Sequence, residues 1–137
     1  MPDPPEDLPE KVLPKASGGA AMKGAWGERA ARAFLEQRGY RTEATNFRTR
    51  FGEIDMIARD GKYIVFIEVK TRKNDRFAAA REHVTAAKQA RVIAAAEAWL
   101  QAHPSGLQPR FDVIEVYGEE GAPVPPRINH LENAFGG

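Results

Sequence analysis

The stretch GEIDMIARDGKYIVFIEVKTR, residues 52–72, alternates apolar and polar side chains before an Asp-Gly pair and is rich in β-branched and aromatic residues after it. Alternation with a period of two is typical of half-buried strands, and Asp60-Gly61 is typical of a two-residue hairpin turn. The stretch therefore predicts an antiparallel hairpin with strands over 51–59 and 62–70. The hairpin sets the register of all the charged side chains in the stretch.

Pairing around such a turn gathers acidic side chains on one face of the hairpin. Asp55 is expected opposite Phe66, and Glu53 opposite Glu68, because side chains two residues apart share a face of a strand. Lys70 then joins this face, and Asp55 lies diagonal to Glu68 at roughly 7 Å. Carboxylates this close repel one another, so the sequence predicts a compensating cation beside them.

Two kinds of cation suit this face, and the sequence leaves both open. One is the ammonium group of Lys70, and the other is a divalent metal ion, since Mg²⁺ prefers carboxylate oxygens. With a metal on Asp55 and Glu68, a phosphoryl oxygen would be polarised and a water acidified, while Lys70 orients that water. The alternative is a surface hairpin whose exposed face is simply charged. Ile57 and Phe66 argue against this alternative, because these apolar residues make the face half buried.

Charge is distributed unevenly along the chain. The net charge is +1 overall, but residues 21–110 carry 17 Lys and Arg against 10 Asp and Glu, whereas 1–20 and 111–137 are both net acidic. A basic body suits a polyanion such as nucleic acid, and the alternative is an ordinary solvated surface of mixed charge. The basic residues that flank the hairpin or begin the second helix are the candidate phosphate contacts: Arg48, Arg50, Arg72, Lys73, Lys88 and Arg91.

The rest of the chain predicts one α/β domain over 21–137 after a flexible tail. Residues 1–20 hold five of the ten prolines, and Met22 is an alternative start of translation. The predicted elements are a helix over 22–38, strands over 40–47, 51–59 and 62–70, a helix over 84–102, a strand over 111–117, and a terminal helical turn containing Ile128, Leu131 and Phe135. The order is α-β-β-β-α-β, and the second helix is long enough for a crossover between parallel strands.

The two helices each carry a charged residue of interest. In the first, Trp26, Ala30 and Phe34, with Ala33 and Gln37, predict the buried stripe. Glu28 lies off that stripe and is either a site residue or an exposed Glu paired with Arg32. In the second, Lys88 lies on the inward stripe, where it either meets phosphate or extends from the edge of the core.

Composition excludes several classes of protein. The chain has no Cys, which rules out disulfides, thiolate nucleophiles and Cys-ligated metal sites. His83, His103 and His130 are scattered and form no zinc pattern. No apolar run reaches the ~20 residues of a membrane span, and no signal peptide is evident. We therefore expect a cytoplasmic protein with no membrane partner.

Several motifs in order resemble the PD-(D/E)xK nuclease superfamily, and more narrowly the YraN-like family. The hairpin supplies Gly-Glu-Ile-Asp at 52–55, with Ile54 in place of Pro, and Phe-Ile-Glu-Val-Lys-Thr-Arg at 66–72. The flanking motifs run in the same order as in that family: Gly-x-x-Gly-Glu at 24–28, Gly-Tyr at 39–40, Asn-x-Arg at 46–48, Lys-x-x-Arg at 88–91 and Arg-Phe-Asp-Val at 110–113. The resemblance covers residues 22 to 117.

This resemblance implies a restriction-endonuclease-like fold, an α-β-β-β-α-β core with a mixed central sheet flanked by helices. It implies Asp55, Glu68 and Lys70 as the nuclease signature, and Glu28 as the helical acidic residue of archaeal Holliday-junction resolvases. The implied cofactor is Mg²⁺ or Mn²⁺ bound by Asp55 and Glu68, and the implied partner is branched or duplex DNA, with a homodimer as in resolvase-like proteins.

Three interpretations follow from the sequence. The first is a metal-dependent endonuclease acting on DNA phosphodiesters, with branched, recombination or repair DNA as the substrate suggested by the resolvase likeness. The second is a non-catalytic nucleic-acid-binding module on a nuclease fold, in which the acidic residues are structural. The third is a protein-interaction adaptor that docks through its tail or its acidic C-terminal segment. The gathered carboxylates and lysine favour the first, because a module without chemistry has no need of them.

Overall fold

The computed structural model describes residues 18–73 and 84–136, which form two helices and five strands. The elements in chain order are α1 (Gly18–Gln37), β1 (Arg41–Thr49), β2 (Gly52–Arg59), β3 (Tyr63–Arg72), α2 (Ala86–Ala102), β4 (Gln108–Tyr117) and β5 (Arg127–Phe135). The strands form one sheet in the order β1-β2-β3-β4-β5, in which only β3 and β4 are parallel. This is the predicted α/β fold with a mixed sheet, extended by a fifth strand.

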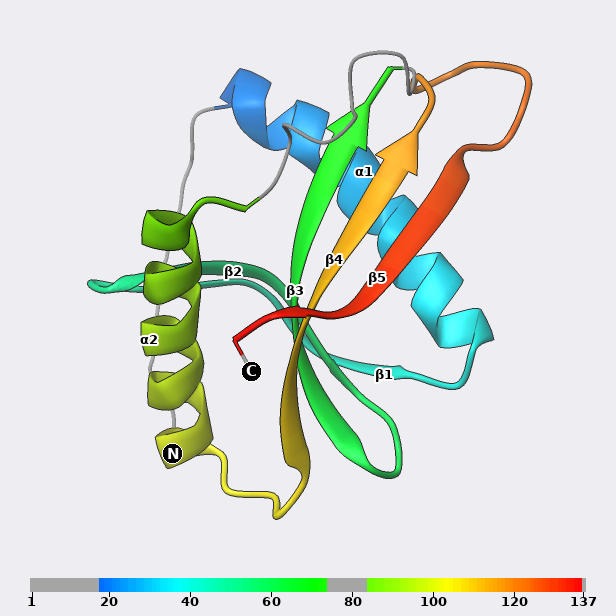
Figure 1. The fold of residues 1–137 in the computed structure, drawn as a ribbon. Helices are drawn as coiled ribbons and strands as arrows, with labels where there is room; N and C mark the ends of the chain where they lie inside the picture. The colour runs from blue at the N-terminus through cyan, green and yellow to red at the C-terminus, as the bar shows by residue number, and fades with distance from the viewer. Residues whose placement is uncertain (1–17, 74–83, 137) are drawn as a thin grey trace.

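Each helix covers one face of the sheet (Figure 1). α2 packs on a core that includes Ile57, Phe66 and Val113, whereas α1 packs on the other face around Met56 and Ile67. α2 connects the parallel strands β3 and β4, as a crossover requires. Neither helix, as far as the chain is described, is long and apolar enough to cross a lipid bilayer.

The buried side of α1 is turned relative to the prediction. Ala31 and Leu35 are fully buried, and Trp26, Ala30 and Phe34 are only partly buried beside them, whereas Ala33 and Gln37 are exposed. The helix ends as predicted, with Gly39 at φ +91°, a conformation that glycine adopts without steric cost. Because the buried stripe is shifted by one residue, Glu28 lies beside it and is not on the solvent face.

The predicted tail of residues 1–20 lies outside the described residues except at its end. Residues 18–20 belong to α1, which begins four residues before the predicted start at 22. The prediction of a tail that holds no regular element is therefore wrong for these last three residues.

The β2–β3 hairpin has a longer turn than the Asp-Gly pair predicts. Arg59 pairs with Ile64, and Asp60 Oδ1 accepts the backbone N–H groups of Lys62 and Tyr63 at 2.9 and 2.8 Å. This Asx-type turn lengthens the connection and moves the register by two residues. A shift of two preserves which side chains share a face. It brings Asp55 level with Glu68, where the prediction placed them diagonally.

The sheet divides at the middle of β2. Pairing between β2 and β3 ends at Met56–Ile67, whereas β2 continues to pair with β1 as far as Gly52 and β3 continues to pair with β4 as far as Arg72. In Figure 1 the β1–β2 ribbon turns away behind α2 while β3, β4 and β5 continue upwards. Asp55 is the first β2 residue beyond the last β2–β3 pair.

The C-terminal segment is a strand, and the predicted helical turn is wrong. Ile128 and Leu131 lie in β5, which is antiparallel to β4, and pair with Val116 and Val113 of β4. A register shift near the end of the strand, with Asn133 at φ +53°, brings Phe135 back to the core on the α2 side. This bulge gives the apolar residues a spacing that imitates a helix.

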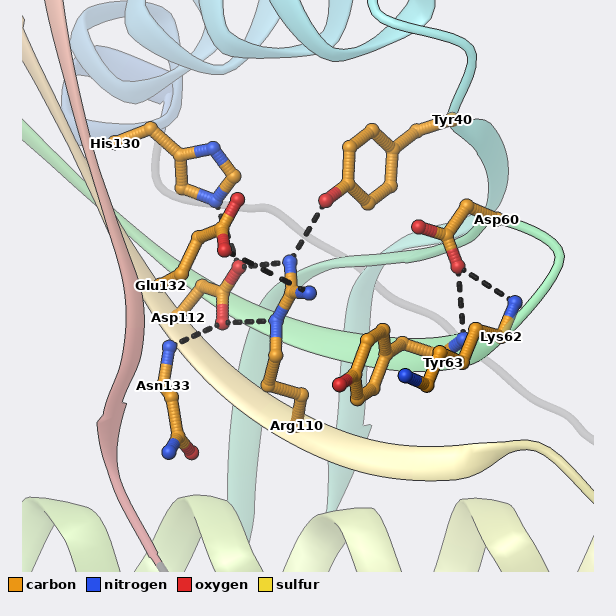
Figure 2. Close-up of polar contacts among 9 residues, drawn as sticks. All are labelled: Tyr40, Asp60, Lys62, Tyr63, Arg110, Asp112, His130, Glu132 and Asn133. Atoms are coloured by element: carbon orange, nitrogen blue, oxygen red, sulfur yellow. Dashed lines mark hydrogen bonds and ion pairs between the residues drawn. The ribbon is translucent and has the colours of Figure 1, made fainter.

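A buried polar network fastens β5 and the end of α1 to the sheet (Figure 2). Asp112, fully buried on β4, accepts two hydrogen bonds from Arg110 at 2.9 and 2.8 Å and one contact from His130 Nε2 at 2.7 Å. It also accepts the backbone N–H of Asn133, and Arg110 donates to the hydroxyl of Tyr40 at 2.7 Å. Arg110, the His130 contact and the Asn133 amide lower the pKa of Asp112 against the opposing effect of burial, which is the largest single influence. The network is locally charge-balanced.

Asp112→Ala is expected to destabilise the protein by about 3 kcal/mol or more, because it leaves the Arg110 guanidinium buried without its carboxylate. The measurement is the midpoint of urea unfolding. Glu132→Ala is the matched control, since Glu132 is exposed and lies 4.0 Å from Arg110, and its expected cost is under about 1 kcal/mol. Equal losses for the two variants would contradict a network centred on Asp112.

Candidate functional site

The site lies where β2 and β3 separate. Asp55 Oδ2 accepts the backbone N–H of Val69 at 2.8 Å, so the side chain bridges the two strands one step beyond their last backbone pair. Ile54 and Ile57 both pack in the core on the α2 side although they are three residues apart. β2 therefore bends between them, and Asp55 sits at the bend.

Glu68 is the most buried acid of the site. It is only 4% exposed, and its Oε2 forms an ion pair with Lys88 Nζ at 2.9 Å. Its Oε1 is buried and has no hydrogen-bond partner in the described part of the chain. Buried carboxylate oxygens without a partner are costly. One oxygen of this carboxylate therefore remains available for a ligand.

Glu28 reaches the same region from α1. Its Oε1 accepts the side-chain amide of Asn46 at 3.1 Å. Burial is the main cause that raises the pKa of Glu28, and the nearby carboxylates of Glu53 and Glu68 raise it further. Electrostatic coupling between Glu28, Asp55 and Glu68 shows that the fold brings these three predicted site residues into one neighbourhood.

Asn46 is a site residue that the sequence reasoning missed. It lies within β1 at φ +53°, a conformation that Asn tolerates better than most residues, and it holds the Glu28 carboxylate. The sequence does contain a signal for the importance of Asn46, because this residue opens the Asn-x-Arg motif and interrupts a predicted strand.

Asp55 carries the largest electrostatic perturbation in this region. Burial, and after it the charge of Glu68, raise the pKa of Asp55 to about 7 against the opposing hydrogen bond from Val69. Glu28 adds to the increase and Lys88 reduces it. Asp55 and Glu68 thus share the ammonium group of Lys88, with the charge of Glu28 also nearby, and this excess of negative charge suits a cation.

The ammonium group that meets the acids is that of Lys88. Its side chain is directed inward, as the helical stripe predicted, because it forms the ion pair with the buried Glu68, and this contact raises the pKa of Lys88. Lys70 follows Glu68 by two residues along β3, and strand alternation places both on the same face. Lys70 is partly exposed. The sequence suggested Lys70 as one candidate for the compensating cation, whereas in the structure Lys88 forms the ion pair with Glu68.

Four of the six predicted phosphate contacts gather at one groove. Arg48, Arg50 and Arg91 line it together with Lys88. Arg48 also forms an exposed ion pair with Glu53 at 3.1 Å. Glu53 therefore lines the groove, whereas the two-residue turn placed it opposite Glu68.

The other two predicted phosphate contacts lie at the far end of β3. Arg72 is nearly buried and forms an ion pair with Glu115 on β4 at 3.6 Å. Lys73 is exposed just beyond the strand. Neither residue lines the groove.

The sequence pattern of the uncharacterised protein family UPF0102 matches residues 27–116. This range contains the divided hairpin, both acids on it and the whole of α2. The chain belongs to the UPF0102 family. That family is the YraN-like group of PD-(D/E)xK-like proteins, so the resemblance noted from the motifs is confirmed.

Individual UPF0102 relatives are similar over most of their length. A UPF0102 protein of Symbiobacterium thermophilum is 48% identical over 110 residues, which cover 80% of this chain and 92% of the relative. A UPF0102 protein of Geobacter sulfurreducens is 44% identical over 113 residues, covering 82% and 87%. One of Xanthomonas oryzae is 41% identical over 116 residues, covering 83% and 91%. These names carry the family and no activity.

The donor set fits a hard divalent cation held by few protein ligands. Asp55 and Glu68 offer carboxylate oxygens, and Mg²⁺ is commonly bound by one or two carboxylates with water and substrate phosphate completing its shell. Within residues 18–73 and 84–136, no three acidic or His side chains form a ready metal-binding cluster. The unpartnered Oε1 of Glu68 is the observation that fits a metal here.

Asp55→Asn is expected to stabilise the metal-free protein by about 1–2 kcal/mol at about pH 8. The folded-state pKa is raised to about 7 from 3.8, so the unfolded state ionises first. Stability from this group is therefore lost as the pH rises between those two values. Asn keeps an oxygen that can accept the Val69 N–H and removes the charge.

The measurement is the urea midpoint in EDTA at about pH 4 and about pH 8. The gain should be present at the higher pH and small at the lower one. Glu97→Gln, an exposed change on α2, is the control and should be neutral at both. A variant that is less stable than the wild type at the higher pH would show that Asp55 is a purely structural acceptor.

Proposed function

We propose that the protein is a Mg²⁺- or Mn²⁺-dependent nuclease that hydrolyses phosphodiester bonds of DNA. One observation carries the proposal: the buried, unpartnered Oε1 of Glu68 lies at the strand division that also holds Asp55. The membership of the UPF0102 family and the restriction-endonuclease-like fold support this proposal, because the signature residues of that fold stand at these positions.

The chain's own residues divide the work at this site. Asp55 and Glu68 would hold the metal, and the Val69 N–H and the Lys88 ammonium group keep their other oxygens in place. A bound metal supplies polarisation of the phosphoryl oxygen and a water that ionises near neutral pH. Lys70, on the same face as Glu68, would orient that water or stabilise the developing charge.

Glu28 is assigned a supporting role. Its carboxylate is held by Asn46 on the α1 side of the site, and its pKa is raised. There it would assist Asp55 and Glu68 in holding the metal, as the counterpart of the helical acidic residue of resolvases. Hydrolysis adds one water across one P–O bond, so the products are a phosphate monoester and a free hydroxyl. A cytoplasmic protein, as the sequence predicts, would have access to chromosomal DNA.

A second candidate function is a non-catalytic nucleic-acid-binding module. The specific observation in its favour is the Lys88–Glu68 ion pair, which already neutralises one of the two proposed ligands. In that case the groove of basic residues binds the backbone, and the acids serve the fold. The unpartnered Glu68 oxygen and the raised pKa of Asp55 favour the nuclease, because a structural acid pair is expected to be better satisfied.

In a cleavage assay, the wild-type protein is expected to cut DNA with Mn²⁺ or Mg²⁺ and not with EDTA. The substrates are linear duplex, nicked duplex and a four-way junction. Asp55→Asn and Lys70→Ala should each lower the rate by at least about a hundredfold, since each removes a group of the proposed reaction centre. Products are resolved on denaturing gels.

Glu97→Gln controls for a charge change on the same protein surface and should cut at the wild-type rate. Binding without cutting in any metal would establish the binding module instead. Cutting that survives Asp55→Asn would place the reaction centre elsewhere.

Mn²⁺ is expected to stabilise the wild-type protein against thermal unfolding, with a gain of about 2.7 kcal/mol at a hundred times the dissociation constant. Glu68→Gln should lose most of this gain, because it removes the charge of a proposed ligand. Glu97→Gln should keep it. Mn²⁺ bound to protein is measured in parallel by electron paramagnetic resonance. An unchanged gain in Glu68→Gln would contradict metal binding at this site.

A further inference from the structure

The turn between β1 and β2 presents an exposed aromatic ring. Thr49 pairs with Gly52, so Arg50 and Phe51 form the two-residue turn. Thr49 Oγ1 accepts the backbone N–H groups of Phe51 and Gly52 at 3.0 and 3.2 Å, which fixes the turn. The Phe51 side chain is nevertheless 50% exposed. A tight turn thus holds a large apolar side chain in solvent.

The turn borders the groove between β2 and α2. The groove encloses about 450 Å³ and is lined by Phe51, by the cations of Arg48, Arg50, Lys88 and Arg91, and by one acid, Glu53. Arg48 is paired with Glu53 and Lys88 with Glu68, so the guanidinium groups of Arg50 and Arg91 give the groove its net positive charge. A positively charged groove is the electrostatic signature of a site for a polyanionic backbone.

Close packing of the turn on α2 fixes the two sides of this groove. A Cβ atom at Gly52 would lie 2.8 Å from the carbonyl oxygen of Arg91, so only glycine permits the observed approach. Phe47 of the same ribbon packs edge-on against Trp99 of α2, with ring centroids 5.2 Å apart. The position of Phe51 relative to Arg91 is therefore set by the fold.

The groove is continuous with the acidic site through Lys88. This residue lines the groove and also forms the ion pair with Glu68. A strand whose phosphates follow the basic residues would lead toward Asp55 and Glu68. Phe51 stands at the groove end formed by the turn, where the guanidinium of Arg50 lies 5.1 Å from the ring centroid.

The surroundings of Phe51 argue against a hydrophobic protein partner. In the described part of the chain the other large exposed apolar residues are Val124 and Leu131, and neither lines the groove. A protein-docking patch needs contiguous apolar surface, whereas Phe51 stands among arginines. Aromatic rings interleaved with cations are typical of sites for unpaired nucleotides, where bases stack on the ring and the cations meet the phosphates.

We infer that Phe51 is a stacking platform for an unpaired base, and that the groove selects DNA with a single-stranded segment over blunt duplex. The inference rests on the proposed function, in that nucleic acid is the substrate of the adjoining acidic site. Bases inside a duplex are already stacked on both faces and offer no surface to a ring at a turn. A single strand, a flap or a junction with unpaired bases does offer one.

Binding in EDTA tests the inference without cleavage. The probes are a fluorescein-labelled single strand, the blunt duplex of the same sequence, and that duplex with a short unpaired tail, read by fluorescence anisotropy. Phe51→Leu keeps an apolar side chain and removes the ring. It should weaken binding of the single strand and the tailed duplex by about tenfold, and of the blunt duplex by less than about twofold.

Phe51→Trp restores an aromatic ring and should restore binding of the first two probes. Leu131→Ala, at an exposed apolar position on β5 away from the groove, should leave all three unchanged. With 2-aminopurine in the unpaired tail, the wild-type protein should change its fluorescence on binding and Phe51→Leu should not. Thermal unfolding of each variant confirms that the fold is intact.

The outcomes separate this inference from the proposed function. Metal-dependent cutting with no probe-specific loss in Phe51→Leu overturns the stacking platform and leaves the nuclease standing. A selective loss in Phe51→Leu, with no cutting in any metal, supports the platform on a binding module and overturns the nuclease. Equal weakening of all three probes, or no binding of any at low salt, overturns the platform.

Discussion

A single hydrogen bond, from the Val69 N–H to Asp55 Oδ2, spans the point at which β2 and β3 part. Backbone pairing has just ended, so a side chain takes over the role of a ladder partner. Only a short side chain with an acceptor oxygen can do this at that depth. The hydrogen bond that links the two strands beyond their last backbone pair therefore also holds the Asp55 carboxylate beside Glu68. The negative charge of Asp55 is poorly solvated in these surroundings. The architecture and the electrostatics of the site have one origin.

The two faces of the sheet treat buried charge in opposite ways. On the α1 side, Arg110 and Asp112 satisfy one another with His130, and the pKa of Asp112 is lowered. At the strand division, Asp55 and Glu68 share a single nearby ammonium group, and the pKa of Asp55 is raised. Fully partnered charge consolidates a fold, whereas a local excess of one sign lowers its stability and marks a place for a ligand. The fully partnered charges and the poorly partnered ones thus lie in different parts of the same sheet.

Local patterns in the sequence predicted most of the fold and the proximity of Asp55 and Glu68. Alternation gave the hairpin, and face sharing along it gave the proximity of Asp55 and Glu68, because a register error of two residues leaves faces unchanged. Long-range features were harder to foresee. The turn at Asp60 depends on side-chain hydrogen bonds, and β5 depends on pairing with a strand already in place. The Lys88–Glu68 pair depends on how α2 lies on the sheet, which periodicity within the helix does not determine.

The absence of a side chain at position 52 has a wider effect than its place in a turn suggests. The backbone of Arg91 occupies the space that a Cβ at position 52 would need. Even one methyl group there would move the β1–β2 ribbon away from α2. The ribbon carries Phe51 at its turn and Asp55 at the point where it leaves β3, so both would be displaced together relative to Lys88. The small size of Gly52 thus keeps Phe51 and Asp55 in their positions relative to α2.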